Sequence, residues 1–180
     1  MPILILEPIT RHMGEVGNNG LSGTLTANVE QSSRPPSFGV SNGAEQRAFL
    51  TFDLNLAPAV VDNATLICRE GGVSGTLDWN DLVIVEQTVT GDQNHLHQAD
   101  FDYAGHYCKT IASMPLGQLQ NPIDVTQALN MAPKPIDTGI ARFTLRLRLA
   151  TPRLAAPSYS WAFDSRPDST QLVLKWHSES

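Results

Sequence analysis

Three histidines and one cysteine with the spacing of metal ligands stand in the segment NHLHQADFDYAGHYC, residues 94–108. His95 and His97 are two positions apart, as are His106 and Cys108, and side chains two positions apart project to the same face of an extended segment. Zinc binds imidazole and thiolate groups in tetrahedral sites, so these residues could form one. A polar loop that contacts another subunit is the alternative, and it is the interpretation that we favour.

Two aspartates, Asp78 and Asp81, flank Trp79 in the segment LDWNDL and could bind calcium. Calcium takes six or more oxygen ligands, and two carboxylates are too few to form such a site by themselves. Aspartate in a turn commonly accepts a hydrogen bond from a nearby backbone N–H group. We therefore expect turn-stabilising aspartates and no cofactor, with structural calcium or zinc as the alternative.

Aromatic side chains could instead form a platform for a sugar, because sugar rings stack on exposed Trp and Tyr. Trp161 and Trp176 stand inside alternating apolar segments, where we expect them to be part of the core. The remaining candidates are Trp79, Tyr103 and Tyr107, which belong to polar segments of the type that form loops. They are the residues that we expect to bind a glycan, if one is bound.

The common catalytic motifs are absent from the sequence, which has no G-x-S-x-G, phosphate loop, dinucleotide fingerprint or H-E-x-x-H. Asp53 has no second acidic group or histidine at a suitable spacing for acid–base catalysis. We expect it to bind turn N–H groups or Arg47. Similarly, we expect Arg166 to bind turn carbonyls, Asp164 or Asp168. These patterns indicate that the protein is not an enzyme.

Short segments in which apolar and polar residues alternate dominate the chain. The strands that they predict would position the candidate site residues. In FTLRLRLA, residues 143–150, apolar side chains alternate with Thr and Arg, which is the period of a β-strand with one solvent-facing side. Turn signals rich in Gly, Pro and Asn separate the segments, among them SNG at 41–43, EGG at 70–72 and RPDS at 166–169. Five further segments are strand-like: AFLTFDL (48–54), ATLIC (64–68), DLVIVEQTV (81–89), YSWAFDS (159–165) and QLVLKWH (171–177).

One segment favours a helix, VTQALN at residues 125–130, with Asp124 or Thr126 placed to accept hydrogen bonds from its first N–H groups. One short helix among many strands predicts an all-β domain, a jelly-roll-like sandwich of two antiparallel sheets. We expect long connections in residues 90–122. We divide the single domain into residues 1–45, an arm or the first strands with long loops, and the sandwich core of residues 46–180.

Four phrases follow one another along the chain: QRAFLTFDLNLAP with VDNATLIC, then LDWNDLVIVEQTV, then PIDVTQALN, and last SWAFDSRPDSTQLVLKWH. In this order they resemble the non-catalytic DNRLRE-type β-sandwich, which is also seen as a carbohydrate-binding module of the disaggregatase-related kind. The resemblance covers residues 46–177 and implies a jelly-roll sandwich used for binding, attachment or structural support, without a catalytic apparatus.

Charge and composition limit the classes of partner that this chain could bind. The formal charge of −6 argues against nucleic acid, and no apolar run is long enough to span a membrane. Residues 1–133 hold 5 Lys and Arg against 14 Asp and Glu, whereas residues 134–180 hold 7 against 4, so one face could be basic. We expect Arg142, Arg146 and Arg148 to lie on that face as an interface.

The start of the chain has no signal-peptide pattern, which predicts synthesis in a cytoplasm. In a reducing cytoplasm we expect Cys68 and Cys108 to remain unbridged.

Three functions follow, in the order in which we expect them. The first is a non-catalytic virion protein of a bacteriophage, a capsid-decoration or tail-accessory subunit that is made in the host cytoplasm. It would form a homo-oligomer and bind other virion proteins through the arginine face or the MPILIL arm. The second is a free-standing carbohydrate-binding module or lectin, and the third is a metal-dependent hydrolase of jelly-roll type.

Overall fold

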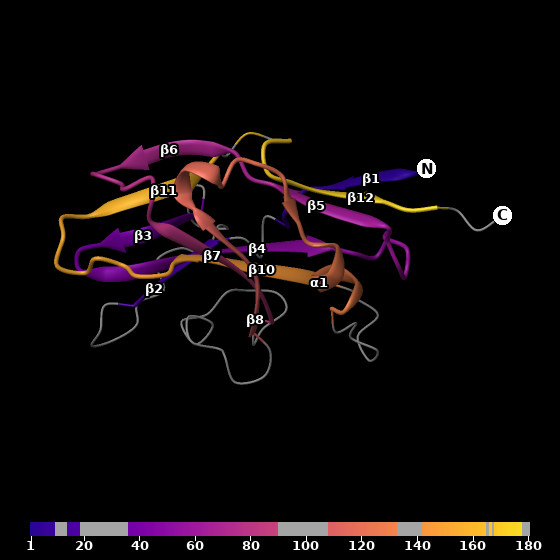
Figure 1. The fold of residues 1–180 in the computed structure, drawn as a ribbon, viewed down its shortest axis with the longest axis horizontal. Coiled ribbons are helices and arrows are strands. Elements are labelled where there is room, and N and C mark those ends of the chain that lie inside the picture. Colours follow the sequence, from indigo (N-terminus) through magenta and orange to yellow (C-terminus); the bar gives the residue numbers. More distant parts are fainter. Residues whose placement is uncertain are drawn as a thin grey trace.

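The chain folds as two antiparallel β-sheets packed around one apolar core (Figure 1). The structure is a computed structural model, and it describes residues 1–9, 14–18, 36–89, 108–132, 142–164, 166 and 168–177, with the backbone alone described for 14–18. Within these residues the predicted all-β sandwich is confirmed.

The smaller sheet has four strands in the order β1-β12-β5-β9, and every pair is antiparallel. Strand β1 forms one edge of this sheet and lies near both termini of the chain (Figure 1). After β1 the chain crosses to the other sheet, where Pro8 bridges to Phe52 and the N–H of Ile9 donates to the carbonyl of Thr51. The strands are β1 (Ile3–Leu6), β12 (Gln171–Lys175), β5 (Asn63–Ile67) and β9 (Ile123–Asp124).

The larger sheet has eight strands, seven of them in the order β6-β11-β3-β4-β10-β7-β8, while β2 pairs with β4. Its middle is formed by the long strands β4 and β10, which pair from Arg142 opposite Asp53 to Leu147 opposite Ala48. The strands are β2 (Gly14–Asn18), β3 (Ser37–Ser41), β4 (Ala44–Asp53), β6 (Glu70–Ser74), β7 (Leu82–Thr88), β8 (Cys108–Pro115), β10 (Arg142–Leu149) and β11 (Tyr159–Phe163).

Alternation along β10 produces much of the core. Its apolar side chains, at every second position from Phe143 to Leu149, are at most 1% exposed and face the smaller sheet. They belong to the same core as Leu172 and Leu174 of β12. Trp161 lies in the same core as predicted, edge-on to Phe163 with the ring centroids 4.9 Å apart.

Two short helical segments lie between β8 and the end of the described range at residue 132. They are the 3₁₀ segment η3 (Leu116–Gln118) and helix α1 (Thr126–Asn130), which confirms the predicted helix. The carboxylate of Asp124 accepts hydrogen bonds from the N–H and hydroxyl of Thr126 at 2.9 and 2.6 Å. At the other end, the amide of Asn130 accepts from the N–H of Val61 and donates to its carbonyl, so side chains fix this short helix to the loop before β5.

All six predicted strands are present within one or a few residues, but two other expectations were wrong. Residues 70–72, expected as a turn, belong to β6. The register between β6 and β11 shifts at Gly71, and a Cβ atom there would overlap the carbonyl oxygen of Phe163. This glycine therefore permits a bulge with close strand approach. In the expected long connection of residues 90–122, residues 108–115 form β8, which pairs with β7.

Candidate functional site

The predicted metal and platform residues lie partly outside the described part of the chain. His95, His97, Tyr103, His106 and Tyr107 all belong to segments that the structure does not describe. Their roles remain predictions. Among the residues that are described, no group of three or more His, Cys, Asp or Glu side chains is placed to hold a metal ion.

Cys108 is described, and it contacts an arginine. Its Sγ accepts a hydrogen bond from Nη2 of Arg146 at 3.1 Å. Burial raises the pKa of the Cys108 thiol, and the positive charge of Arg146 lowers it by less, so the thiol is protonated at neutral pH. Cys68 is buried in the core, where burial raises its pKa to about 12. Both cysteines are free, as expected.

An ion cluster on the outer face of the larger sheet contains two of the three predicted interface arginines. Arg146 on β10 lies opposite Glu86 on β7, and their side chains meet at 2.8 Å. Arg148 donates to the other carboxylate oxygen of Glu86 at 3.0 Å. Burial raises the pKa of Glu86, but the hydrogen bonds and charges of Arg148 and Arg146 outweigh it and hold that pKa below its ordinary value.

Arg142, the third of these arginines, is not part of the cluster. Its strand neighbour is Asp53, but the carboxylate of Asp53 accepts from the N–H of Asn55 at 2.8 Å. Nε and Nη1 of Arg142 are buried and have no hydrogen-bond partner in the described part of the chain. The arginine face therefore divides into an internal ion cluster and one separate guanidinium, and its role as an interface remains a prediction.

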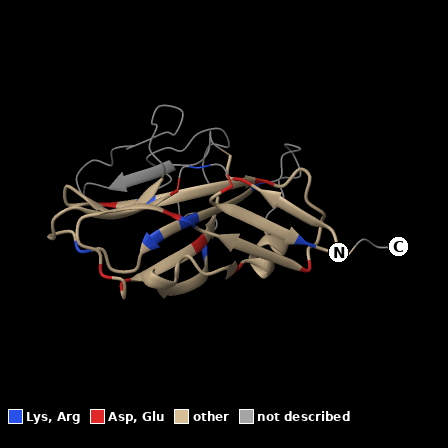
Figure 2. Cartoon of the chain, turned by 90° about the horizontal axis from the view of Figure 1, so that it is seen from above, with Lys and Arg blue, Asp and Glu red and all other residues tan. Residues whose placement is uncertain are grey.

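The outer face of β10 is less exposed than its alternation predicts. Thr144 and Arg146 are 7% and 4% exposed, although both were expected to face solvent. Each has a partner: the hydroxyl of Thr144 meets that of Thr51 at 2.9 Å, and Arg146 binds Glu86. Alternation separates polar from apolar positions, but it does not distinguish a hydrated polar side chain from a buried one with a partner. Figure 2 shows that charged positions are few on the strands and that basic and acidic ones lie near one another.

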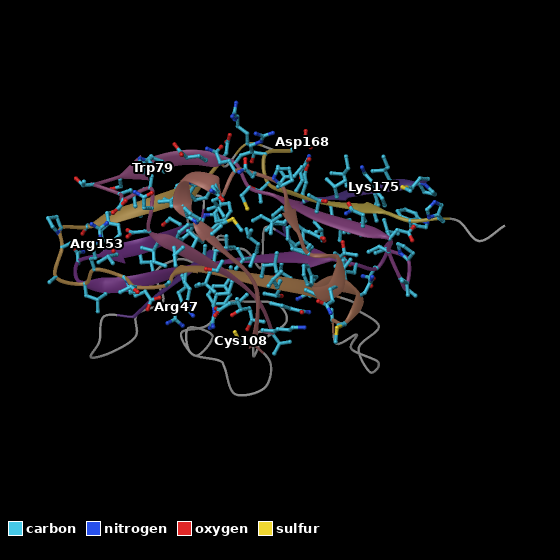
Figure 3. The ribbon with its side chains drawn as sticks, viewed as in Figure 1. Arg47, Trp79, Cys108, Arg153, Asp168 and Lys175 are labelled. Carbon is cyan, nitrogen blue, oxygen red and sulfur yellow. The ribbon has the colours of Figure 1, made fainter. Side chains whose placement is uncertain are left out.

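Trp79 occupies an exposed, hydrogen-bonded turn near one end of the sandwich (Figure 3). Its side chain is 46% exposed, and its carbonyl accepts from the N–H of Gly117 at 2.9 Å. The carboxylate of Asp78 accepts from the N–H of Asn80, which confirms the predicted turn. Asp81 binds Arg153 at 3.0 Å. The turn therefore holds an aromatic ring toward solvent.

Two other polar residues have the structural roles expected of them. Asp53 binds a turn N–H, while Arg47 pairs with Glu45 at 2.9 Å. Nε of Arg166 donates to the carboxylate of Asp164 at 2.7 Å, and these hydrogen bonds lower the pKa of Asp164. Neither set of contacts places two acid–base groups across a pocket from one another.

A small cavity that the sequence did not indicate lies between β8 and α1, with a volume of about 180 Å³. Lys109 and Asp124 both line it, and the apolar part of its wall includes Ile111, Val125 and Ala128. The Thr126 hydroxyl and N–H lower the pKa of Asp124, so this carboxylate is ionised at neutral pH. The cavity combines opposite charges with an apolar wall, but its described lining includes no pair suited to acid–base catalysis.

The edge strand β1 exposes apolar side chains. Ile3 and Ile5 are 59% and 54% exposed, and Met1 beside them is 69% exposed. Leu4 and Leu6, on the other face, pack against the core. Within the described residues β1 pairs with β12 alone. Polar residues usually mark the solvent-facing side of a strand, and the run ILIL contains none. The sequence of β1 therefore does not show which of its two faces is exposed.

No helix among the described residues has the length and apolar character needed to cross a membrane. No protein-family model matches the chain, and no curated protein sequence matches it. The resemblance to the DNRLRE-type sandwich accordingly remains a prediction.

Proposed function

We propose that this chain is a non-catalytic structural or attachment protein, a capsid-decoration or tail-accessory subunit that binds other proteins of a bacteriophage particle. The observation that carries the proposal is the exposed apolar row formed by Ile3 and Ile5 on the edge strand β1 and by Met1 just before it. The virion is the setting that the sequence favours for such a subunit.

An exposed apolar edge strand favours association with another protein. Its outward N–H and C=O groups are a template for another strand, and monomeric proteins usually protect such edges with charges, bulges or covering segments. Between Met1 and Leu6 the chain has no charged side chain. Partner binding by strand addition uses an edge of this kind, with backbone hydrogen bonds for affinity and side chains for specificity.

The placement of the described ionisable groups also supports a structural role. Glu86 is held between two arginines, and Asp81 is bound to Arg153. Both carboxylates tie together segments that are distant in the sequence. Groups engaged in this way stabilise the sandwich, and they are not free to exchange protons with a substrate.

The direct test is to ask whether the chain is part of assembled particles. Particles from a producing culture would be purified on a density gradient and analysed by mass spectrometry. We expect the chain to sediment with the particles at a constant ratio to their major protein. Recovery of the chain only among free proteins at the top of the gradient would contradict the proposal.

A carbohydrate-binding module is the second candidate, and the exposed ring of Trp79 favours it. An indole that is 46% exposed on a turn fixed by backbone hydrogen bonds is suited to stacking on a sugar ring. If a glycan array detects binding, Trp79→Ala should abolish it. Leu154→Ala removes a side chain of similar exposure (49%) and should leave binding unchanged. An array without any signal would eliminate this candidate.

A further inference from the structure

The backbone of β1 has one hydrogen-bonding edge engaged and the other directed away from its sheet. The N–H of Trp176 donates to the carbonyl of Pro2, and the register pairs Leu4 with Leu174 and Leu6 with Leu172. In an antiparallel strand the N–H and C=O of one residue point to the same side, and this side alternates along the strand. The backbone groups of Ile3 and Ile5 therefore point away from β12.

We propose that β1 pairs with β1 of a second copy of this chain in antiparallel orientation, with Ile3 of each copy opposite Ile5 of the other. The pairing joins the two four-stranded sheets into one continuous sheet across a two-fold axis at Leu4. This inference rests on the proposed role of β1 as a docking strand and identifies its first partner.

The register follows from the backbone and from the exposed side chains together. With Ile3 opposite Ile5 of the second copy, the outward N–H and C=O groups of both residues form hydrogen-bonded pairs. The same register places the exposed isoleucines of both copies next to one another on the outer face, continuous with Val173, the strand neighbour of Ile5. A shift by one residue would place isoleucines on opposite faces and misalign the backbone groups.

Charge also favours a second copy as the partner. The segment MPILIL has no charged side chain, so side-chain charges do not oppose the approach of two such strands. Glu7 and Asp168 lie at one end of the β1–β12 pair, where the neighbouring Asp168 raises the pKa of Glu7, while Lys175 lies at the other end (Figure 3). Lys175 has no ion-pair partner among the described residues. Antiparallel pairing places the acidic end of one copy beside the basic end of the other.

The first experiment measures the mass of the full chain in solution as a function of concentration, by sedimentation or light scattering. We expect a dimer. Ile3→Lys and Ile5→Lys introduce charges at exposed positions on β1 and should weaken the dimer at least tenfold without unfolding the chain. Val60→Lys, at a position that is 68% exposed outside the strands, is the matched control and should leave the dimer intact.

The second experiment tests the register by cysteine cross-linking. Under mild oxidation, a mixture of the Ile3→Cys and Ile5→Cys chains should form a disulfide-linked dimer in high yield. Each variant alone should cross-link weakly, because identical positions lie apart in this register. The unchanged chain, which contains buried Cys68 and half-buried Cys108, measures the background.

A chain that is monomeric at all concentrations, or a dimer unaffected by both lysine variants, would overturn this inference. So would a dimer in which the mixed cysteine variants form no cross-link above background. A monomer that still sediments with phage particles would refute the self-pairing but not the proposed function. A β1-paired dimer absent from particles would refute the virion role and leave the pairing standing.

Discussion

Glu86 is the shared partner of Arg146 and Arg148, and its side chain and that of Arg146 are both nearly buried. In Glu86→Ala the buried guanidinium of Arg146 loses its carboxylate, and removal of one member of a buried ion pair typically costs about 3–5 kcal/mol. We expect a loss of about 3 kcal/mol in the free energy of unfolding, measured by urea denaturation. Asp81→Ala removes a pair whose arginine side chain is 43% exposed and should cost much less.

The same carboxylate makes stability depend on pH. Its pKa is lower in the folded chain than its ordinary value of 4.5, so the stabilisation is fully present above that value and is lost as the pH falls through the folded-state pKa. Glu86→Gln has no such titration. The difference in unfolding free energy between the wild-type chain and Glu86→Gln should therefore be largest near neutral pH and shrink in acid. A difference that stays constant down to pH values well below the ordinary pKa would show that Glu86 does not titrate in this way.

Local polar contacts were predictable from the sequence, whereas contacts between distant strands were not. Asp78 and Arg166 bind groups two residues away in the chain, which turn chemistry indicates. The Glu86–Arg146 pair joins positions 60 residues apart. It exists because β7 lies beside β10, and strand order is determined by the packing of the whole sandwich.

At the scale of elements, the strands found from the sequence are those with strict alternation, such as β10. Strand β8 escaped prediction because its pairing with β7 shifts register between Val85 and Glu86, which interrupts the two-residue period. Strand β6 escaped because its glycines are typical of turns. In both strands the irregular sequence pattern that prevented prediction accompanies a register shift against the neighbouring strand.

The backbone after β6 lies close to the backbone at Ser158, and this contact gives a prediction with a matched control. Gly75, which follows β6, has a φ of 67°, and a Cβ atom there would overlap the carbonyl oxygen of Ser158. Gly75→Ala should therefore destabilise the fold by about 2 kcal/mol or more. At Gly72 a Cβ would meet nothing within 4 Å, so Gly72→Ala should change stability by less than about 0.5 kcal/mol. Urea denaturation of the two variants checks the difference; equal losses would contradict it.

At the scale of the whole molecule, the N-terminal segment connects the sandwich to its proposed partner. It forms the edge of the smaller sheet through β1, and then it bridges to Phe52 of the larger sheet. A partner bound at β1 therefore holds a segment that belongs to both layers. Association at this edge should stabilise the complete fold, because it favours the state in which β1 is paired.

This coupling predicts that the melting temperature depends on protein concentration. For a dimer that unfolds to two separated chains, mass action raises the midpoint with concentration, and an unfolding enthalpy typical of chains this long gives about 2 °C for each tenfold increase. Ile5→Lys should remove this dependence, while Gly75→Ala should lower the midpoint and retain it, because Gly75 follows β6, which belongs to the other sheet. Differential scanning calorimetry over a hundredfold range of concentration measures both effects. A wild-type midpoint independent of concentration, in a protein that sedimentation shows to be dimeric, would mean that the dimer separates before the sandwich unfolds.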